Sequence, residues 1–161
     1  MKTTEIKILV HEFESIQELN GEEAGLLLEA RRITEQAYAP YSGFHVGAAV
    51  LLGNGQIVTG NNQENSAYPS GLCAERVALF YANANFPESA VKTIAISAAK
   101  NGVLVEDTVT PCGSCRQALA EAEVRFGSPI RVILDGKKSI LVLDGVESLL
   151  PLSFSKKALD K

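Results

Sequence analysis

Three cysteines in two clusters are the feature that most constrains the fold of this 161-residue chain. Cys73 stands alone, whereas Cys112 and Cys115 form a Cys-x-x-Cys pair. Because the number is odd, the cysteines cannot all pair as disulfides within one chain. In a reducing compartment such thiols serve the core, redox chemistry or a metal ion. The positions of the cysteines relative to the predicted helices help to distinguish these three roles.

Both clusters lie where helices are predicted to begin. After Cys73, and again after Pro111, apolar residues repeat with the period of one helical face. The repeats are Val77, Phe80, Tyr81 and Ala84, and Cys115, Leu119, Ala122 and Phe126. At a helix start, cysteines spaced i, i+3 can direct their sulfurs to one point, and the positive helix end favours thiolates. The pattern therefore predicts two helix N-termini that aim three thiolates at one centre.

The rest of the chain alternates strand and helix patterns. Further helices are predicted at 22–39 and 146–150, and strands at 5–13, 44–52, 56–59, 91–99, 130–134 and 139–143. The Asn54-Gly55 step between two apolar runs is typical of a β-hairpin. Such intermixing predicts an α/β domain whose sheet is covered by helices, and the hairpins make that sheet mixed. We expect one domain over residues 21–161, preceded by an N-terminal extension, residues 1–20, that holds an edge strand.

Composition excludes some classes of partner. The net charge is -4, and no run of lysine and arginine exceeds two residues. A nucleic-acid groove needs clustered cations to neutralise phosphates. No apolar run approaches the roughly 18 residues that span a bilayer, and the N-terminus lacks the apolar segment of a secretory signal. We therefore expect a cytoplasmic protein whose partners are neither nucleic acids nor membranes.

Three thiolates are a donor set that zinc prefers, and three protein ligands leave the fourth tetrahedral position open for water. Three thiolates and a divalent ion together carry a net charge of -1, which disfavours ionisation of a bound water. Neighbouring donors or cations must therefore offset part of the negative charge on the sulfurs. Arg76, three positions after Cys73, is the candidate for that task, although it could also be an exposed helix arginine. Glu75 is a candidate general acid and base beside the metal.

Two other interpretations of the cysteines remain open at this point. Cys112 and Cys115 alone could form a redox pair. A structural zinc site could be closed by His45 or His11 as the fourth ligand. Neither interpretation gives Glu75 a role beyond that of a partner for the helix dipole.

Taken together, these residues resemble a known family. Cys73-Ala74-Glu75 with Pro111-Cys112-x-x-Cys115 resembles the zinc nucleoside and nucleobase deaminases. Over about residues 24–155 the chain is similar to the small, three-cysteine cytidine deaminases. The matching stretches, in order, are 39–44, 46–49, 60–65, 68–76, 111–117 and 149–154. The resemblance implies a three-layer α/β/α fold with a mixed central sheet of about five strands.

The resemblance also implies an activity. It is the hydrolytic deamination of cytidine and deoxycytidine to uridine or deoxyuridine and ammonia, with a zinc-bound hydroxide and Glu75 as proton shuttle. One zinc ion per subunit would be held by Cys73, Cys112 and Cys115. The alternative is a deaminase of another aminopyrimidine nucleoside such as blasticidin S. A polynucleotide-editing deaminase is disfavoured by acidity and by the lack of a basic, aromatic strand channel, and a non-catalytic zinc or redox module leaves Glu75 unexplained.

Substrate-binding residues follow from the same resemblance. Asn62 and Glu64 match the ribose-binding pair, and an amide with a carboxylate can both donate to and accept from sugar hydroxyls. Phe44 matches an aromatic residue that packs on the nucleoside, although it could be a core strand residue. Ser66 and Ala74, with the backbone at Cys112, are expected at the base edge. Tyr68 and Phe154 match residues at sites shared between subunits, which implies a homo-oligomer, preferably a tetramer.

Overall fold

The computed structural model describes residues 1–155 and 158–159, so the lysine pair at 156–157 and the last two residues of the expected domain lie outside it. The sheet consists of β1 (His11–Phe13), β2 (Phe44–Leu52), β3 (Ile57–Asn61), β4 (Val91–Lys100), β5 (Val103–Leu104), β6 (Arg131–Leu134) and β7 (Ile140–Asp144). The helices are α1 (Gly21–Ile33), α2 (Ala74–Asn85) and α3 (Gly113–Phe126). Short 3-10 turns occur at η1 (Ile16–Glu18), η2 (Thr34–Gln36), η3 (Tyr68–Ser70) and η4 (Val146–Ser148).

The predicted α/β fold with a mixed sheet is confirmed. The strand order is β1-β7-β6-β4-β2-β3, and β5 pairs with the end of β4. The β4–β6 pair is parallel and the other pairs are antiparallel. Within the described residues the sheet has seven strands instead of about five. The two additional strands are short: β1 has three residues and β5 has two.

The predicted hairpin is also present. β2 and β3 pair from Leu51↔Ile57 to Gly47↔Asn61. Between the strands, Gly55 has a φ of +83°, a left-handed conformation that glycine adopts without strain. The hairpin matters for function because β3 leads directly into the loop that precedes Cys73.

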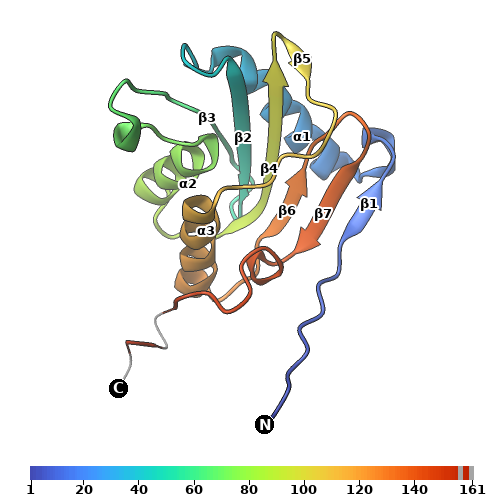
Figure 1. Cartoon of the computed structure of the whole chain (residues 1–161), viewed down its shortest axis with the longest axis vertical. Coiled ribbons are helices and arrows are strands. Elements are labelled where there is room, and N and C mark those ends of the chain that lie inside the picture. The colour runs from blue at the N-terminus through green and yellow to red at the C-terminus, as the bar shows by residue number, and fades with distance from the viewer. Residues whose placement is uncertain (156–157, 160–161) are drawn as a thin grey trace.

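Helices cover both faces of the sheet, as Figure 1 shows, with α2 and α3 on one face and α1 on the other. The side chains of β2 alternate between these layers. Ala48, Val50 and Leu52 belong to the core beneath α2 and α3, whereas Ala49 and Leu51 belong to the core beneath α1. Since both faces are buried, the strand reads as one continuous apolar run.

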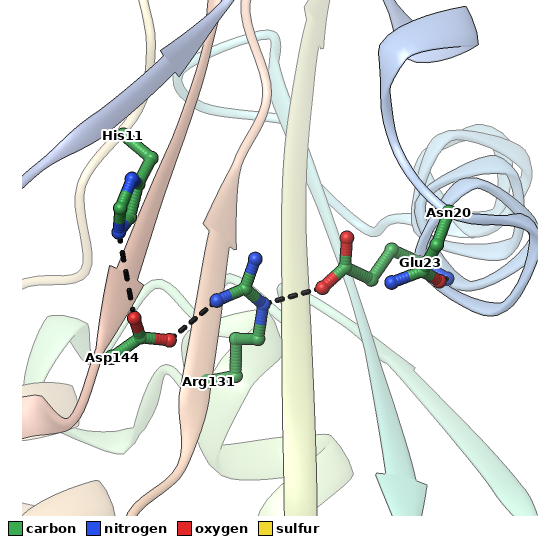
Figure 2. Close-up of polar contacts among 5 residues, drawn as sticks. All are labelled: His11, Asn20, Glu23, Arg131 and Asp144. Carbon is green, nitrogen blue, oxygen red and sulfur yellow. Dashed lines mark hydrogen bonds and ion pairs between the residues drawn. The ribbon is translucent and has the colours of Figure 1, made fainter.

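The N-terminal segment is attached to the sheet by a short strand and a chain of polar contacts. Figure 2 shows His11 beside Asp144, which pairs with Arg131, which in turn pairs with Glu23 at the start of α1. The His11 Nε2 to Asp144 Oδ2 distance is 3.5 Å. The side chain of Asn20 caps α1 by accepting a hydrogen bond from the Glu23 amide at 2.9 Å.

Several boundaries differ from the sequence prediction. The helix expected at 22–39 is shorter, because α1 ends at Ile33 and only the 3-10 turn η2 follows it. The edge strand covers His11–Phe13 only, because residues 1–10 are exposed and make no ladder. The segment expected as a short helix at 146–150 forms only the single 3-10 turn η4. β5 was not predicted, since two residues are too few for a periodic signal. Along the part of the chain that the structure describes, no helix has the length and apolar character needed to cross a membrane.

Candidate active site

The three cysteines meet between the starts of α2 and α3. Cys73 is the N-cap of α2, Cys112 is the N-cap of α3, and Cys115 lies in the first turn of α3. The carbonyl of Cys73 accepts from the Val77 amide at 3.1 Å, and the carbonyl of Cys112 accepts from the Arg116 amide at 2.9 Å. Neither cap uses its side chain for a hydrogen bond to the helix backbone. Both sulfurs therefore remain available as ligands.

The sulfur positions fit a single metal ion. The Sγ atoms of Cys73 and Cys112 are 3.8 Å apart, and those of Cys112 and Cys115 are 3.5 Å apart. All three sulfurs lie within 4.8 Å of one another. Around a tetrahedral zinc ion, sulfurs about 2.3 Å from the metal lie roughly 3.8 Å from each other. The cluster therefore has the chemistry and the spacing of a three-thiolate metal site.

The other interpretations of the cysteines do not match this arrangement. All three cysteines are free, and 3.5 Å between the Cys112 and Cys115 sulfurs is far from a disulfide bond of about 2.05 Å. Neither histidine belongs to a metal-binding group among the described residues. His45 lines a separate cavity with Arg31, and His11 pairs with Asp144. A structural zinc site closed by either histidine is thus excluded by the fold.

The pKa values of two of the thiols, Cys73 and Cys115, are shifted in opposite directions. Hydrogen bonding with the Cys115 thiol, together with Arg76 nearby, lowers the pKa of Cys73 to about 5 although burial opposes this. The pKa of Cys115 is raised, chiefly by its hydrogen bond with Cys73 and then by burial. Arg76 Nη2 lies 3.9 Å from the Cys73 sulfur. Its Nε atom is buried without a hydrogen-bond partner in the described structure.

Glu75 lies in the first turn of α2 with only 4% of its surface exposed. Burial is the main cause that raises the pKa of its carboxyl group, and the charge on Cys73 adds to the effect. A carboxyl group whose pKa is raised above its ordinary value is better suited to donate as well as accept a proton. Its place beside the sulfur cluster is the one that a proton carrier needs.

A cavity of about 700 Å³ opens onto this cluster. Its size lies within the range of about 300–1,000 Å³ that is common for small-molecule sites. Cys73, Cys112, Glu75 and Arg76 line one end of it. Of the predicted substrate-binding residues, those that line it are Phe44, Asn62, Glu64 and Tyr68.

Three predicted substrate-binding residues do not line this cavity. Ser66 lies in the exposed loop after Glu64, and Ala74 is fully buried at the start of α2. The side chain of Phe154 is 63% exposed, and its carbonyl accepts a hydrogen bond from Gln117 Nε2 at 2.9 Å. Their proposed contacts with substrate therefore stay predictions.

The side chain of Asn62 is built into the sheet edge. Its Oδ1 accepts from the Val46 amide at 2.8 Å, and its Nδ2 donates to the Phe44 carbonyl at 2.9 Å. The amide thus continues the β-ladder beyond the end of β3 and fixes the orientation of the residue. Asn62 faces the cavity as a rigid group.

Sequence reasoning missed several residues that line the cavity. Tyr41 and Ser42 belong to a motif of the family resemblance, but no function was assigned to them. The rings of Tyr41 and Tyr68 meet edge to face, with centroids 6.1 Å apart. Val109 and Thr110 also line the cavity, and their position just before Pro111 was the only available signal.

Comparisons with known proteins agree with this geometry. A family model described as the cytidine and deoxycytidylate deaminase zinc-binding region matches residues 22–126. The chain is 42% identical over 134 residues to a cytidine deaminase of Sporosarcina psychrophila, which covers 83% of this chain and 92% of that protein. It is 44% identical over 99 residues to a cytidine deaminase of Halalkalibacterium halodurans, covering 60% of this chain and 68% of the relative. The crystal structure of cytidine deaminase from Burkholderia pseudomallei superposes with a TM-score of 0.69 at 34% identity, covering 81% of this chain and 97% of that one.

Proposed function

The chain belongs to the cytidine and deoxycytidylate deaminase family, and we propose that this enzyme hydrolyses cytidine and deoxycytidine to uridine or deoxyuridine and ammonia. The observation that carries the proposal is the buried Glu75 carboxyl beside three convergent thiols at one end of a nucleoside-sized cavity. A specialised aminopyrimidine such as blasticidin S is not favoured, because the similar proteins named above are cytidine deaminases.

We propose that Cys73, Cys112 and Cys115 hold one zinc ion per subunit. The observed sulfur separations of 3.5 and 3.8 Å support this assignment. Zinc bound there would supply a Lewis acid that makes water nucleophilic at neutral pH. The guanidinium of Arg76, 3.9 Å from the Cys73 sulfur, would offset part of the excess negative charge of the three thiolates.

Glu75 would move the protons of the reaction. It accepts a proton from the attacking water and delivers it to N3 of the pyrimidine ring, while a bond forms between the water oxygen and C4. It then takes the remaining proton from the new C4 hydroxyl and transfers it to the amino group. The C4–N bond breaks as the C4 carbonyl forms, and ammonia leaves. The pKa of the Glu75 carboxyl, raised chiefly by burial, supports both transfers, because burial makes the protonated form easier to populate than in a free carboxyl.

Substrate contacts are proposed for the residues around the cavity. Asn62 and Glu64 would bind sugar hydroxyls, and Phe44 would pack on the nucleoside. Ser66 and Ala74 would contribute at the base edge. Tyr68, which is 76% exposed at the cavity rim, would stand where a second subunit completes the site.

We propose a homotetramer in which Phe154 enters the cavity of a neighbouring subunit. Its 63% exposed side chain, held through its backbone by Gln117, supports this arrangement. Sedimentation measurements should give a tetramer, and Phe154→Ala should raise the KM for cytidine. A monomer with full activity would remove Phe154 from the site.

Two broader assignments remain proposals. The deaminase domain would comprise residues 21–161, with 1–20 as an extension, and the match of the family model from residue 22 supports that start. A cytoplasmic location would suit three free thiols, because that compartment keeps cysteines reduced.

The decisive experiment compares Glu75→Gln with the wild-type enzyme at equal zinc content. Cytidine deamination, followed by absorbance, should fall by about 10²–10⁴-fold in the variant, the usual contribution of a positioned acid or base. The control is Glu22→Gln, the same change at an exposed position in the first turn of α1, which should leave activity unchanged. Equal activity of wild type and Glu75→Gln would exclude the proton-carrier role.

A further inference from the structure

Ser42 makes a set of hydrogen bonds that joins two loop segments lining the cavity. The residue lies in the exposed loop before β2, 22 positions from Glu64 in the sequence. Its hydroxyl donates to Glu64 Oε1 and accepts from the Phe44 amide at 3.0 Å. A hydroxyl group has one hydrogen to donate, so this one is fully committed to Glu64.

The Glu64 carboxylate is held from its other oxygen as well. Glu64 Oε2 accepts from the Tyr41 amide at 2.8 Å and from the Ser42 amide at 3.3 Å. These contacts fix the direction of a partly exposed side chain that would otherwise lose rotational freedom when a ligand ordered it. The loop therefore orders Glu64 before substrate arrives.

Counting lone pairs shows what the ordered carboxylate can still do. Two carboxylate oxygens offer about four acceptor positions, and the three donors of the loop occupy three of them. The remaining acceptor suits a single O–H donor. The lowered pKa of Glu64, caused mainly by the Ser42 hydroxyl, keeps the group ionised and unable to donate.

We propose that Ser42 determines selectivity for the sugar by holding the Glu64 carboxylate as a preorganised acceptor for a hydroxyl of the furanose ring. The inference rests on the proposed deaminase function and deepens it. A carboxylate fixed by three donors discriminates best when its partner is also fixed, and hydroxyls on the furanose ring are held more rigidly than one on a rotatable arm. Ser42 is thus a positioning residue that acts through Glu64.

The test separates sugar recognition from general damage to the loop. The KM for cytidine and the inhibition constant of 2′,3′-dideoxycytidine against cytidine deamination are measured for wild type, Ser42→Ala and Ser42→Thr. Ser42→Ala should raise the KM about 10-fold, the loss of one well-aligned charged hydrogen bond, with kcat within about twofold. The inhibition constant of the dideoxynucleoside should not change, and Ser42→Thr should restore the KM because it keeps the hydroxyl.

Ser89→Ala is the matched control, because the Ser89 hydroxyl also accepts from a loop amide, that of Asn54 at 3.2 Å, but lies outside the active-site cavity. It should leave both constants unchanged. An equal change for both nucleosides in Ser42→Ala, or a fall in kcat alone, would overturn the inference while leaving the proposed function intact. A wild-type enzyme that does not convert cytidine at all would instead overturn the proposed function.

Discussion

Replacement of Gly60 by alanine should impair the candidate active site by displacing α2, the helix that packs on Gly60. Gly60 lies in β3, paired with Ala48, and the first turns of α2 pass directly over it. A Cβ atom at this position would lie 2.5 Å from the Ala78 nitrogen and 2.8 Å from the Ala74 carbonyl oxygen. Both neighbours are helix backbone, so no side-chain rotation can relieve the contact. The helix that starts with Cys73 and carries Glu75 has to move.

The size of the effect follows from these distances. Non-bonded heavy atoms prefer separations of about 3.5 Å or more, so α2 must retreat by about 1 Å. Forcing an extra methyl group into a packed interface costs about 1–3 kcal/mol of unfolding free energy. A misplacement of about 1 Å at catalytic groups can reduce turnover by about 10²-fold. We therefore expect a moderate loss of stability and a much larger loss of activity.

The assay compares Gly60→Ala with Gly25→Ala. Gly25 is an exposed interior residue of α1, and a Cβ there meets no atom within 4 Å. Since alanine is the better helix former by about 0.8–1.0 kcal/mol, Gly25→Ala should raise the urea midpoint and leave kcat unchanged. Gly60→Ala should lower the urea midpoint, reduce kcat and speed the loss of the bound metal, proposed above to be zinc, to a chelator.

The measurements can refute this reasoning directly. If Gly60→Ala retains wild-type kcat and zinc retention, the close contact between β3 and α2 does not set the position of Cys73 and Glu75. If both glycine variants change stability in the same direction, the contact distances are not the cause of the effect.

Two further predictions concern charge. Arg31→Met should lower the free energy of unfolding by about 3 kcal/mol, because it leaves the fully buried Asp135 carboxylate, now paired at 2.7 Å on each oxygen, without its cation. Urea unfolding checks this against Arg32→Met, which removes an exposed pair with Glu29 and should cost far less stability. Equal losses in the two variants would contradict the role of burial. Because the pKa of Glu64 lies below its ordinary value of 4.5, its contribution to stability and binding is present above 4.5 and is lost only as the pH falls through the lowered value. The KM of the wild type for cytidine should therefore begin to rise at a lower pH than that of Ser42→Ala, and coincident pH profiles would show that the hydroxyl does not govern ionisation of Glu64.

Much of the fold could be predicted because its signals are local. The apolar stripes after Cys73 and Pro111 mark α2 and α3, and the step at Asn54-Gly55 marks the β2–β3 hairpin. Short elements were missed for the same reason. β5 has two residues, and β1 uses only the last three of a longer alternating run. Such segments are ordered by the strand beside them, and their own sequence carries no sufficient period.

The sequence by itself identified the candidate metal ligands and the candidate proton carrier. Cys73, Glu75, Cys112 and Cys115 could be named because helix starts and i, i+3 spacing are encoded by near neighbours in the chain. Only the tertiary structure decided how these groups meet: Cys73 and Cys112, 39 positions apart, come to 3.8 Å because α2 and α3 pack on the same face of the sheet. It also excluded both histidines from the cluster and joined Ser42 to Glu64 in the cavity lining. The pairing of distant segments depends on packing of the whole core, which no local pattern in the sequence records.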